Sequence, residues 1–442
     1  MEAASEGGEI FRHPAVTGVG AFYGDFMSKY RLPKMLSQAA VSVLDQAWLS
    51  ALNFMLGLAL IRLATKDAYG VYAQLFAAGL FATSVLESVV LNPLVNLVSG
   101  RNREDETTVI GHMDRYQRRL GSVVALVLGA ACAGIAVHTA QPHPLTLGIA
   151  FAAFIKANAS REYARSIAFI EFQPERVLRI DVAYGAALIL GVGTLAWFGL
   201  WRIDGIFAVL ALANLVTLSI EGRPAYRMAG ALGNYHETVR QAWKRGRLGL
   251  PGTILAWIVN YSYLYLAAAW LGASASADLN ASRLLLMPIS LSVVAWSRVA
   301  RPRIGRLVGE SRQMQLDRLL GFSLLALLLS TALYVVALWF ALPWLQVHVL
   351  GGKYDNAGPL LLLWGIYFAV NAARWVGTAA LMGKDRYGFM LVESVVCFIA
   401  MFVALAVAVP LYGVSGAVIA LIAVEGLSLA MTWGIYWYAR SK

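Results

Sequence analysis

Residues 389–438 read FMLVESVVCFIAMFVALAVAVPLYGVSGAVIALIAVEGLSLAMTWGIYWY, with Glu393 and Glu425 as the only charged side chains. The segment consists of two apolar stretches, 389–410 and 414–438, joined by a short turn. Each is long enough to cross ~30 Å of hydrocarbon as an α-helix, which takes about 20 residues. Because hydrocarbon offers no hydrogen-bond partners, a continuously apolar segment satisfies its backbone groups there only as a helix. The segment therefore predicts a helical hairpin across a membrane.

The same character extends over most of the chain. Of its 442 residues, 59% are hydrophobic and only 14% charged, whereas a soluble domain carries about 25% charge. The mean hydropathy is +0.64. We therefore predict an all-α membrane protein with twelve transmembrane helices. Their expected ranges are 41–63, 73–97, 120–137, 145–165, 178–200, 205–220, 253–271, 276–297, 319–341, 357–381, 389–410 and 414–438.

The distribution of lysine and arginine predicts the orientation. The N-terminal tail, the even-numbered connections and the C-terminus hold 29 of the 36 Lys and Arg residues, and the odd-numbered connections hold 3. Short loops rich in Lys and Arg remain on the cytoplasmic side, so both termini are expected in the cytoplasm. The net charge of +11 then reflects topology and affinity for anionic headgroups. It does not indicate nucleic-acid binding.

A polar stretch divides the chain into two halves. We expect a cytoplasmic tail at 1–37, a six-helix bundle at 38–220, a linker at 221–249 and a second six-helix bundle at 250–442. Within the linker, apolar and basic side chains alternate at helical spacing. This pattern is typical of an amphipathic helix on the cytoplasmic leaflet, and a solvated linker is the alternative. The apolar residues are Leu232, Tyr235, Val239 and Trp243, opposite Arg240, Lys244, Arg245 and Arg247.

Weak internal similarity suggests that the halves are pseudo-symmetric. Similar spacings recur in Asn53, Ala73 and Pro93 and in Asn260, Ala281 and Pro302. Paired bundles with a central cavity and a site near the bilayer midplane are typical of secondary transporters.

Four short motifs resemble those of a known family. They are Asn53 with AYGVYA at 68–73, VLGGKYDNA at 349–357, LMGKDR at 381–386 and YGVSGA at 412–417. They are similar to turns of the polysaccharide (O-antigen type, Wzx-like) flippases of the multidrug/oligosaccharidyl-lipid/polysaccharide exporter superfamily. In physical terms they are turn and packing motifs, since glycine allows a positive φ and small residues allow close helix approach.

The resemblance implies a flippase in a bacterial inner membrane. Its substrate would be an undecaprenyl-pyrophosphate-linked oligosaccharide, moved from the inner to the outer leaflet by alternating access. A polysaccharide polymerase and a chain-length regulator are the implied partners. The resemblance implies no cofactor, although a proton or sodium gradient would drive transport.

Besides Arg62 near the end of its span, three cationic residues lie well inside predicted spans: Lys156, Arg283 and Arg374. A charge at membrane depth costs ~2.5–3.5 kcal/mol on insertion scales, so it usually faces a cavity or a partner. We hypothesise that these cations line the central cavity and bind the pyrophosphate. The alternative is structural ion pairing, for example of Arg374 with Glu393 or Glu425.

Acidic residues inside the spans are candidates for ion coupling. Glu87 is the first candidate, with Glu425 and Asp45 as companions. A carboxyl in hydrocarbon favours its protonated form because the charge is desolvated, so it can load and release a proton or a sodium ion. The alternative is that each is a protonated or paired structural acid. Asp45, Asp181 and Glu393 lie near the cytoplasmic ends of their spans, where they can reach the interface.

Aromatic and amide side chains in the spans are candidates for sugar binding. Trp257, Tyr261 and Asn260 fall in one span, where rings can stack on a pyranose and an amide can bind its hydroxyls. The alternative is interfacial anchoring or helix packing. Further aromatic and amide candidates are Tyr263, Tyr265, Trp364, Tyr367 and Asn371.

The sequence carries no catalytic or metal-binding pattern. It lacks a Walker-type glycine loop, the six histidines have no metal-ligand spacing, and no nucleophile accompanies a base. We therefore expect no enzyme activity and no metal. The alternatives to a flippase are a multidrug exporter of the same superfamily and a non-transporting scaffold of a glycan-synthesis complex. A membrane glycosyltransferase or polymerase is disfavoured because the external loops are short.

Overall fold

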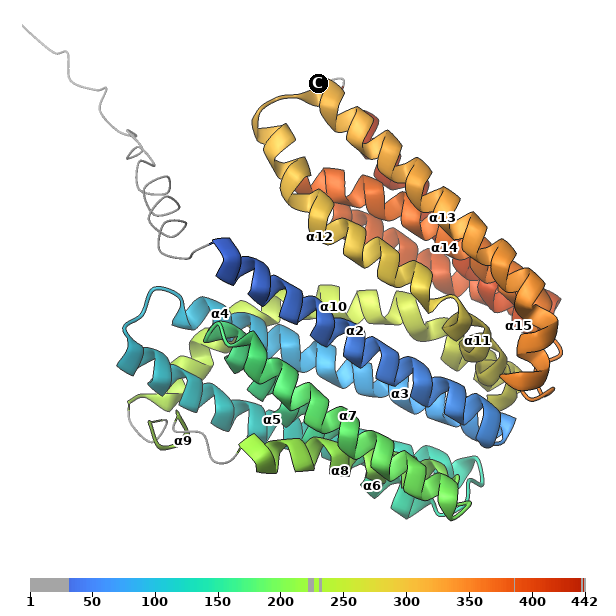
Figure 1. Ribbon diagram of the computed structural model, residues 1–442, viewed down its shortest axis with the longest axis horizontal. Helices are drawn as coiled ribbons and strands as arrows, with labels where there is room; N and C mark the ends of the chain where they lie inside the picture. Colours follow the sequence, from blue (N-terminus) through green and yellow to red (C-terminus); the bar gives the residue numbers. More distant parts are fainter. Residues whose placement is uncertain (1–31, 222–225, 230–232, 385, 439, 441–442) are drawn as a thin grey trace, which may run out of the picture.

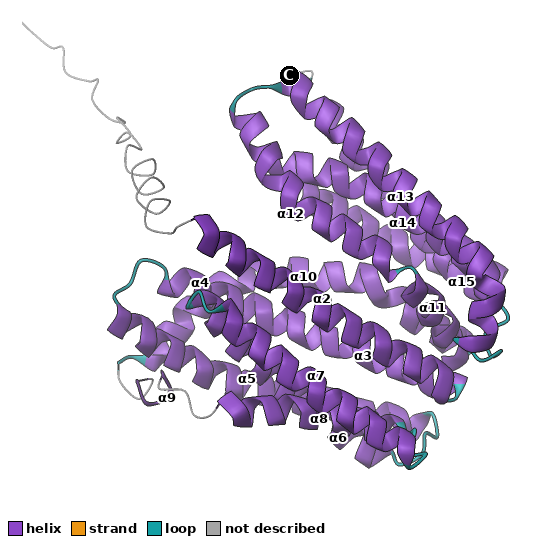
Figure 2. Cartoon of the chain, viewed as in Figure 1, coloured by secondary structure: helices purple, strands orange, loops and turns teal. Residues whose placement is uncertain are grey.

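The computed structural model describes residues 32–221, 226–229, 233–384, 386–438 and 440. Within these ranges the chain forms helices and connecting turns, with no strand (Figure 2). The helices are α2 (Leu32–Leu63), α3 (Lys66–Leu86), the π-helical turn η1 (Glu87–Leu91), α4 (Asn92–Val98), α5 (Arg103–His138), α6 (Pro144–Ile170), α7 (Pro174–Trp197), α8 (Ile203–Glu221), α9 (Tyr226–Ala229), α10 (Tyr235–Leu271), α11 (Ala273–Leu285), α12 (Met287–Gly309), α13 (Gln313–His348), α14 (Ala357–Gly383) and α15 (Tyr387–Tyr438).

Twelve segments of the described chain are long enough to cross a membrane. Nine helical segments meet this criterion by length and apolarity, with α3, η1 and α4 counted as one segment, and α11 with α12 forms a further span bent by 52°. α15 contains two of the crossings, because Gly413 breaks the helix with a φ of 58°. α6 is the twelfth, although Lys156 and a group of charges near its end lower its apolarity. The prediction of an all-α membrane protein with twelve helices is confirmed.

The helices form two bundles that meet at one end and diverge at the other (Figure 1). One bundle contains α2 to α8 and the other α12 to α15, and the extensive packing between them runs through α10 and α11. Near the turn that joins α2 to α3, one apolar core unites both bundles and includes Tyr69, Leu279 and Trp364. Toward the end that bears the C-terminus, each bundle has a core of its own. The structure is therefore closed at the predicted outer end.

Two of the four turn motifs, at 349–357 and 412–417, contain glycines with the positive φ that the sequence predicted. Gly351, Gly352 and Gly413 all have positive φ, between 58° and 67°. Gly416 packs so closely on the adjoining helix that a Cβ there would collide with the carbonyl oxygen of Ala408. These glycines thus permit the reversals and close helix contacts on which the second bundle depends.

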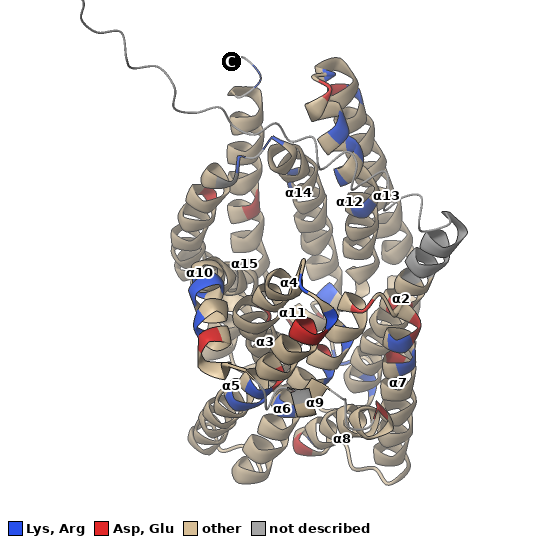
Figure 3. Ribbon diagram, turned by 90° about the vertical axis from the view of Figure 1, so that its left-hand side faces the viewer, with Lys and Arg blue, Asp and Glu red and all other residues tan. Residues whose placement is uncertain are grey.

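Two sequence-based assignments need correction. Arg161 and Arg165 had been counted with the cytoplasmic connection after the span at 145–165, yet both lie within α6, which continues to Ile170. Arg161 is only 5% exposed, and its charge is compensated inside the bundle rather than by water. The lysine and arginine bias between the two sides persists without these two residues. Figure 3 shows that most of each helix is free of charged residues.

The predicted linker is partly helical. α10 begins at Tyr235 and continues through the predicted span without interruption, so the basic segment is an extension of a membrane helix. Tyr235 and Val239 are half-buried, and Trp243 is exposed. Residues 1–31 of the predicted tail and Leu232 of the linker lie outside the described residues. The remaining tail residues belong to α2.

We expect the substitution Gly416→Ala to lower the thermal stability of the detergent-solubilised protein by several degrees. The added methyl group meets the backbone at Ala408, and overpacking of this kind costs about 1–3 kcal/mol. Thermal unfolding monitored by tryptophan fluorescence measures the effect. Gly434→Ala is the matched control because nothing lies within 4 Å of its added Cβ; an equal midpoint for both variants would contradict the close packing.

Candidate functional site

Arg283 lies on α11 inside the membrane-spanning region, surrounded by aromatic side chains. Its guanidinium donates a hydrogen bond of 3.0 Å to the hydroxyl of Tyr263. The guanidinium carbon lies 5.8 Å from the ring centre of Tyr261 and 5.7 Å from that of Trp364. Within the described part of the chain, Arg283 forms no salt bridge with a carboxylate. The rings stabilise the cation partly through their π-faces, and its charge is left for an anion to balance.

Arg374 has a different environment on the neighbouring helix α14. Its Nε is paired with the carboxylate of Glu425 on α15, and Asn371 donates a 2.8 Å hydrogen bond to the same oxygen. The predicted alternative of an ion pair is therefore what this structure contains at Arg374. Glu393 accepts hydrogen bonds from Ser428 and from Thr432.

Lys156 lies on α6 in the first bundle. Its ammonium donates a hydrogen bond to the backbone carbonyl of Arg118 on α5. The three predicted cations thus do not converge on one point.

A cavity of about 410 Å³ lies between η1 and α10 and brings together four of the predicted site residues. Its walls come from α10 and from the continuous segment of α3, η1 and α4. Its lining consists of Ser84, Glu87, Ser88, Asn92, Thr253, Ala256, Trp257, Asn260 and Tyr261. Tyr261 borders both this cavity and Arg283, so the two sites adjoin. The sequence did not indicate Ser84, Asn92 or Thr253.

The π-helical turn explains how Glu87 reaches the cavity. Pro93 has no N–H to give to the usual helical hydrogen bond, and the N–H of Asn92 bonds instead to the carbonyl of Glu87, five residues back. Such π-turns add one residue to a helical turn and are frequent at functional sites. At this turn Gly246 of α10 approaches closely, since a Cβ there would lie 2.7 Å from the Cα of Val89.

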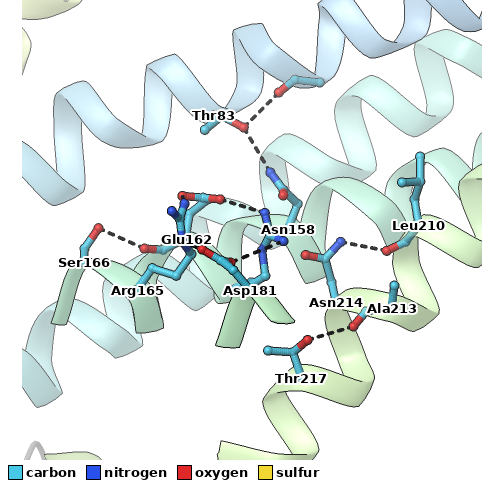
Figure 4. A network of polar contacts seen from close by, with 12 residues as sticks. Thr83, Asn158, Glu162, Arg165, Ser166, Asp181, Leu210, Ala213, Asn214 and Thr217 are labelled. Atoms are coloured by element: carbon cyan, nitrogen blue, oxygen red, sulfur yellow. Dashed lines mark hydrogen bonds and ion pairs between the residues drawn. The ribbon is translucent and has the colours of Figure 1, made fainter. Parts of the chain in front are cut away.

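Asp45, which the sequence had suggested for coupling, belongs to a charge cluster in the first bundle. Figure 4 shows Glu162, Arg165 and Asp181 of this cluster. Arg165 lies at its centre, with nitrogens 3.2 Å from Asp45, 2.8 Å from Glu162 and 2.7 Å from Asp181. Arg161 contributes a second cation, 3.0 Å from Glu162. Asp45 and Asp181 are 2% and 0% exposed, so they do not reach the interface as predicted.

Sequence reasoning missed Arg161, Glu162 and Arg165 as buried groups. Their proximity to a predicted loop suggested solvation. Their i, i+1 and i+4 spacing could have indicated the cluster, because it places three charges close together on one helix. Acidic residues in two other spans were available to pair with them.

Polar contacts close the predicted outer end, and we call them the outer latch. Lys66 at the start of α3 forms a 2.8 Å salt bridge with Asp278 on α11. Lys353, from the turn before α14, donates hydrogen bonds of 2.8 and 2.9 Å to the carbonyls of Arg62 and Ala64. The latch thus joins the α2–α3 turn of one bundle to elements of the other.

Comparison with solved structures identifies this architecture. The chain superimposes on an inward-facing multidrug resistance MATE family transporter of the MOP superfamily with a TM-score of 0.72 and 12% identity, over 88% of this chain and 94% of the other. It has the fold of these transporters. An outward-facing MATE family transporter gives a TM-score of 0.60 at 12% identity, over 91% and 95% of the two chains.

A flippase has the same architecture. Lipid II flippase MurJ in an inward closed conformation matches with a TM-score of 0.66 and 12% identity, over 90% of this chain and 87% of the other. At such low identity the likeness establishes the fold alone. No family model matches the sequence, and no curated protein matches it. The similar solved structures are transporters and a flippase rather than enzymes.

We expect Arg165→Gln to destabilise the protein by about 3–5 kcal/mol, because it leaves Asp45 and Asp181 without their shared cation. Thermal unfolding in detergent measures the loss. Adding Asp181→Asn to the Arg165→Gln variant should recover part of the lost stability, since one uncompensated charge is then removed. Arg312→Gln, which breaks an exposed pair with Glu310, should change the midpoint little. Equal effects of Arg165→Gln and Arg312→Gln would show that the cluster is not structural.

Proposed function

We propose that this protein is a flippase that moves a lipid-pyrophosphate-linked oligosaccharide from the inner to the outer leaflet by alternating access. The observation that carries the proposal is Arg283, a cation within the membrane that no carboxylate of the described chain neutralises. A pyrophosphate would supply the missing charge, and charge-assisted hydrogen bonds to phosphate are strong in a site of low dielectric. Arg374 and Lys156 contribute less, since each already has a partner.

The outer latch and the divergence of the two bundles support the mechanism. In this state the two bundles diverge toward the predicted cytoplasmic end (Figure 1), and the likeness is greater to the inward-facing MATE transporter than to the outward-facing one. Export requires the bundles to rock, which breaks the Lys66–Asp278 pair and the Lys353 contacts. Asp278 is only 5% exposed, and the apolar core that includes Tyr69 and Trp364 also joins the bundles at this end, so opening has to separate this core as well as break these bonds.

The remaining features of the proposal follow from the family resemblance and the charge distribution. The protein would reside in a bacterial inner membrane with both termini in the cytoplasm. Its substrate carrier would be undecaprenyl pyrophosphate, and its partners a polysaccharide polymerase and a chain-length regulator.

A multidrug exporter is the second candidate. The likeness to MATE family transporters favours it, as does Glu87 in a cavity with Trp257 and Tyr261, because a carboxylate with aromatic rings also suits an organic cation. Arg283 beside Tyr261 argues against a cationic substrate at this place.

We expect Arg283→Gln to abolish export of the oligosaccharide while the protein still accumulates in the membrane. The substitution removes the charge that balances the pyrophosphate. Lipid-linked oligosaccharide translocation in proteoliposomes measures the effect. Arg318→Gln, an exposed arginine on α13, is the control and should transport normally. Normal translocation by Arg283→Gln would end the proposal.

Ion coupling is assigned to Glu87 rather than to Glu425 or Asp45. Both of the latter form salt bridges with arginines, so each carboxylate already has a partner within the protein. Glu87 has no salt bridge in the described chain and borders the cavity, so it can exchange a proton or a sodium ion.

We expect Glu87→Gln to uncouple transport from the ion gradient, since glutamine cannot release a proton. Translocation in proteoliposomes should then become independent of an imposed pH or sodium gradient. Glu175→Gln, at the start of α7, should retain the dependence of the unmodified protein. An unchanged gradient dependence of Glu87→Gln would exclude this residue as the coupling group.

A further inference from the structure

The cavity between η1 and α10 contains side-chain groups that could form hydrogen bonds but have no partner in the described part of the chain. Within the described chain, the side chains of Ser84, Glu87 and Asn92 make no hydrogen bond or salt bridge. Asn260 uses only its amide N–H, donated to the carbonyl of Ala256 at 2.7 Å, and its amide oxygen is available. Thr253 donates to the carbonyl of Gly249, and its oxygen can still accept. A ligand here would meet both donors and acceptors.

Aromatic rings form one wall of the same cavity. Trp257 and Tyr261 are stacked, with ring centres 5.7 Å apart and planes inclined by 30°, and Phe81 lies 4.9 Å from Trp257. The indole N–H of Trp257 donates a 3.0 Å hydrogen bond to the carbonyl of Ala77. The indole is therefore held in one orientation before any ligand arrives, which lowers the entropy lost on binding.

We propose that this cavity binds the sugar residue attached directly to the diphosphate, a proposal that rests on the flippase function above. Tyr261 borders Arg283 on one side and the cavity on the other. A diphosphate held at Arg283 would thus direct its first sugar into the cavity. The volume of about 410 Å³ falls within the ~300–1,000 Å³ of typical ligand pockets.

The residue types match a pyranose. Its vicinal hydroxyls can donate to the carboxylate of Glu87 and to the oxygen of Asn260, and they can accept from the amide N–H of Asn92. One face of the ring carries C–H groups that pack on an indole. An organic cation would use the carboxylate and the rings but none of the amides, and the charge of Arg283 nearby would repel it.

The experiment compares ligands that differ only in the sugar. The full chain in nanodiscs is titrated with farnesyl diphosphate, and with farnesyl diphosphates that carry glucose, galactose or N-acetylglucosamine. At least one sugar-bearing probe should bind about tenfold more tightly than farnesyl diphosphate, which equals ~1.4 kcal/mol. This gain corresponds to one or two net hydrogen bonds.

The variant Asn92→Ala should reduce this tenfold ratio to less than about threefold, because it removes the amide that faces the sugar. Asn96→Ala is the matched control, since Asn96 lies one turn further along α4, outside the cavity, and donates only to the carbonyl of Asn92. It should keep the ratio of the unmodified protein. A ratio that falls equally in both variants would overturn the assignment of the cavity.

The remaining outcomes separate this inference from the proposed function. Equal affinity for all four probes, combined with loss of binding in Arg283→Gln, would refute the sugar site and leave the anion site intact. Unchanged binding of farnesyl diphosphate by Arg283→Gln would refute the flippase proposal itself. Displacement of the sugar-bearing probe by tetraphenylphosphonium, with loss of that displacement in Glu87→Gln, would identify the cavity as a cation site and overturn the inference.

Discussion

The cost of a charge in hydrocarbon governs the organisation of this molecule. An ionised group at membrane depth has to be balanced by a partner, by water or by a ligand. The first bundle balances one group of charges internally, since Arg165 and Arg161 are shared among Asp45, Glu162 and Asp181. The second bundle does so at Arg374 through Glu425. Around Arg283 on α11, the described chain supplies only a phenol hydroxyl and aromatic faces.

This contrast separates charges that stabilise the fold from those available for function. The cluster around Arg165 is enclosed and connects α2, α6 and α7, so it ties helices together. Arg283 and Glu87 have no salt-bridge partners in the described chain, and Tyr261 connects their surroundings. They lie where α10 and α11 carry the packing between the two bundles. A ligand bound there would contact the helices through which the two bundles pack on each other.

Much of the fold could be predicted because it depends on local chemistry. A stretch such as 414–438 has only one way to satisfy its backbone in lipid, and Gly413 marks a reversal because glycine tolerates positive φ. The candidate site was harder to predict from the sequence. Glu87, Trp257, Asn260 and Tyr261 were chosen individually for polarity or aromaticity at membrane depth. Their meeting in one cavity depends on a π-helical turn and on helix packing between distant segments, neither of which has a pattern in the sequence.

The sequence by itself determined the number of spans, the turns and the expected orientation. The length of the apolar stretches predicted the spans, the glycines predicted the turns, and the lysine and arginine bias predicted the orientation. The pairing of charges was decided only by the tertiary structure. Arg165 could have met water, an acid or a ligand, and the choice depended on Asp45 and Asp181 arriving from two other helices. Attraction between charges acts across a few ångströms in space, whereas the sequence records only separation along the chain.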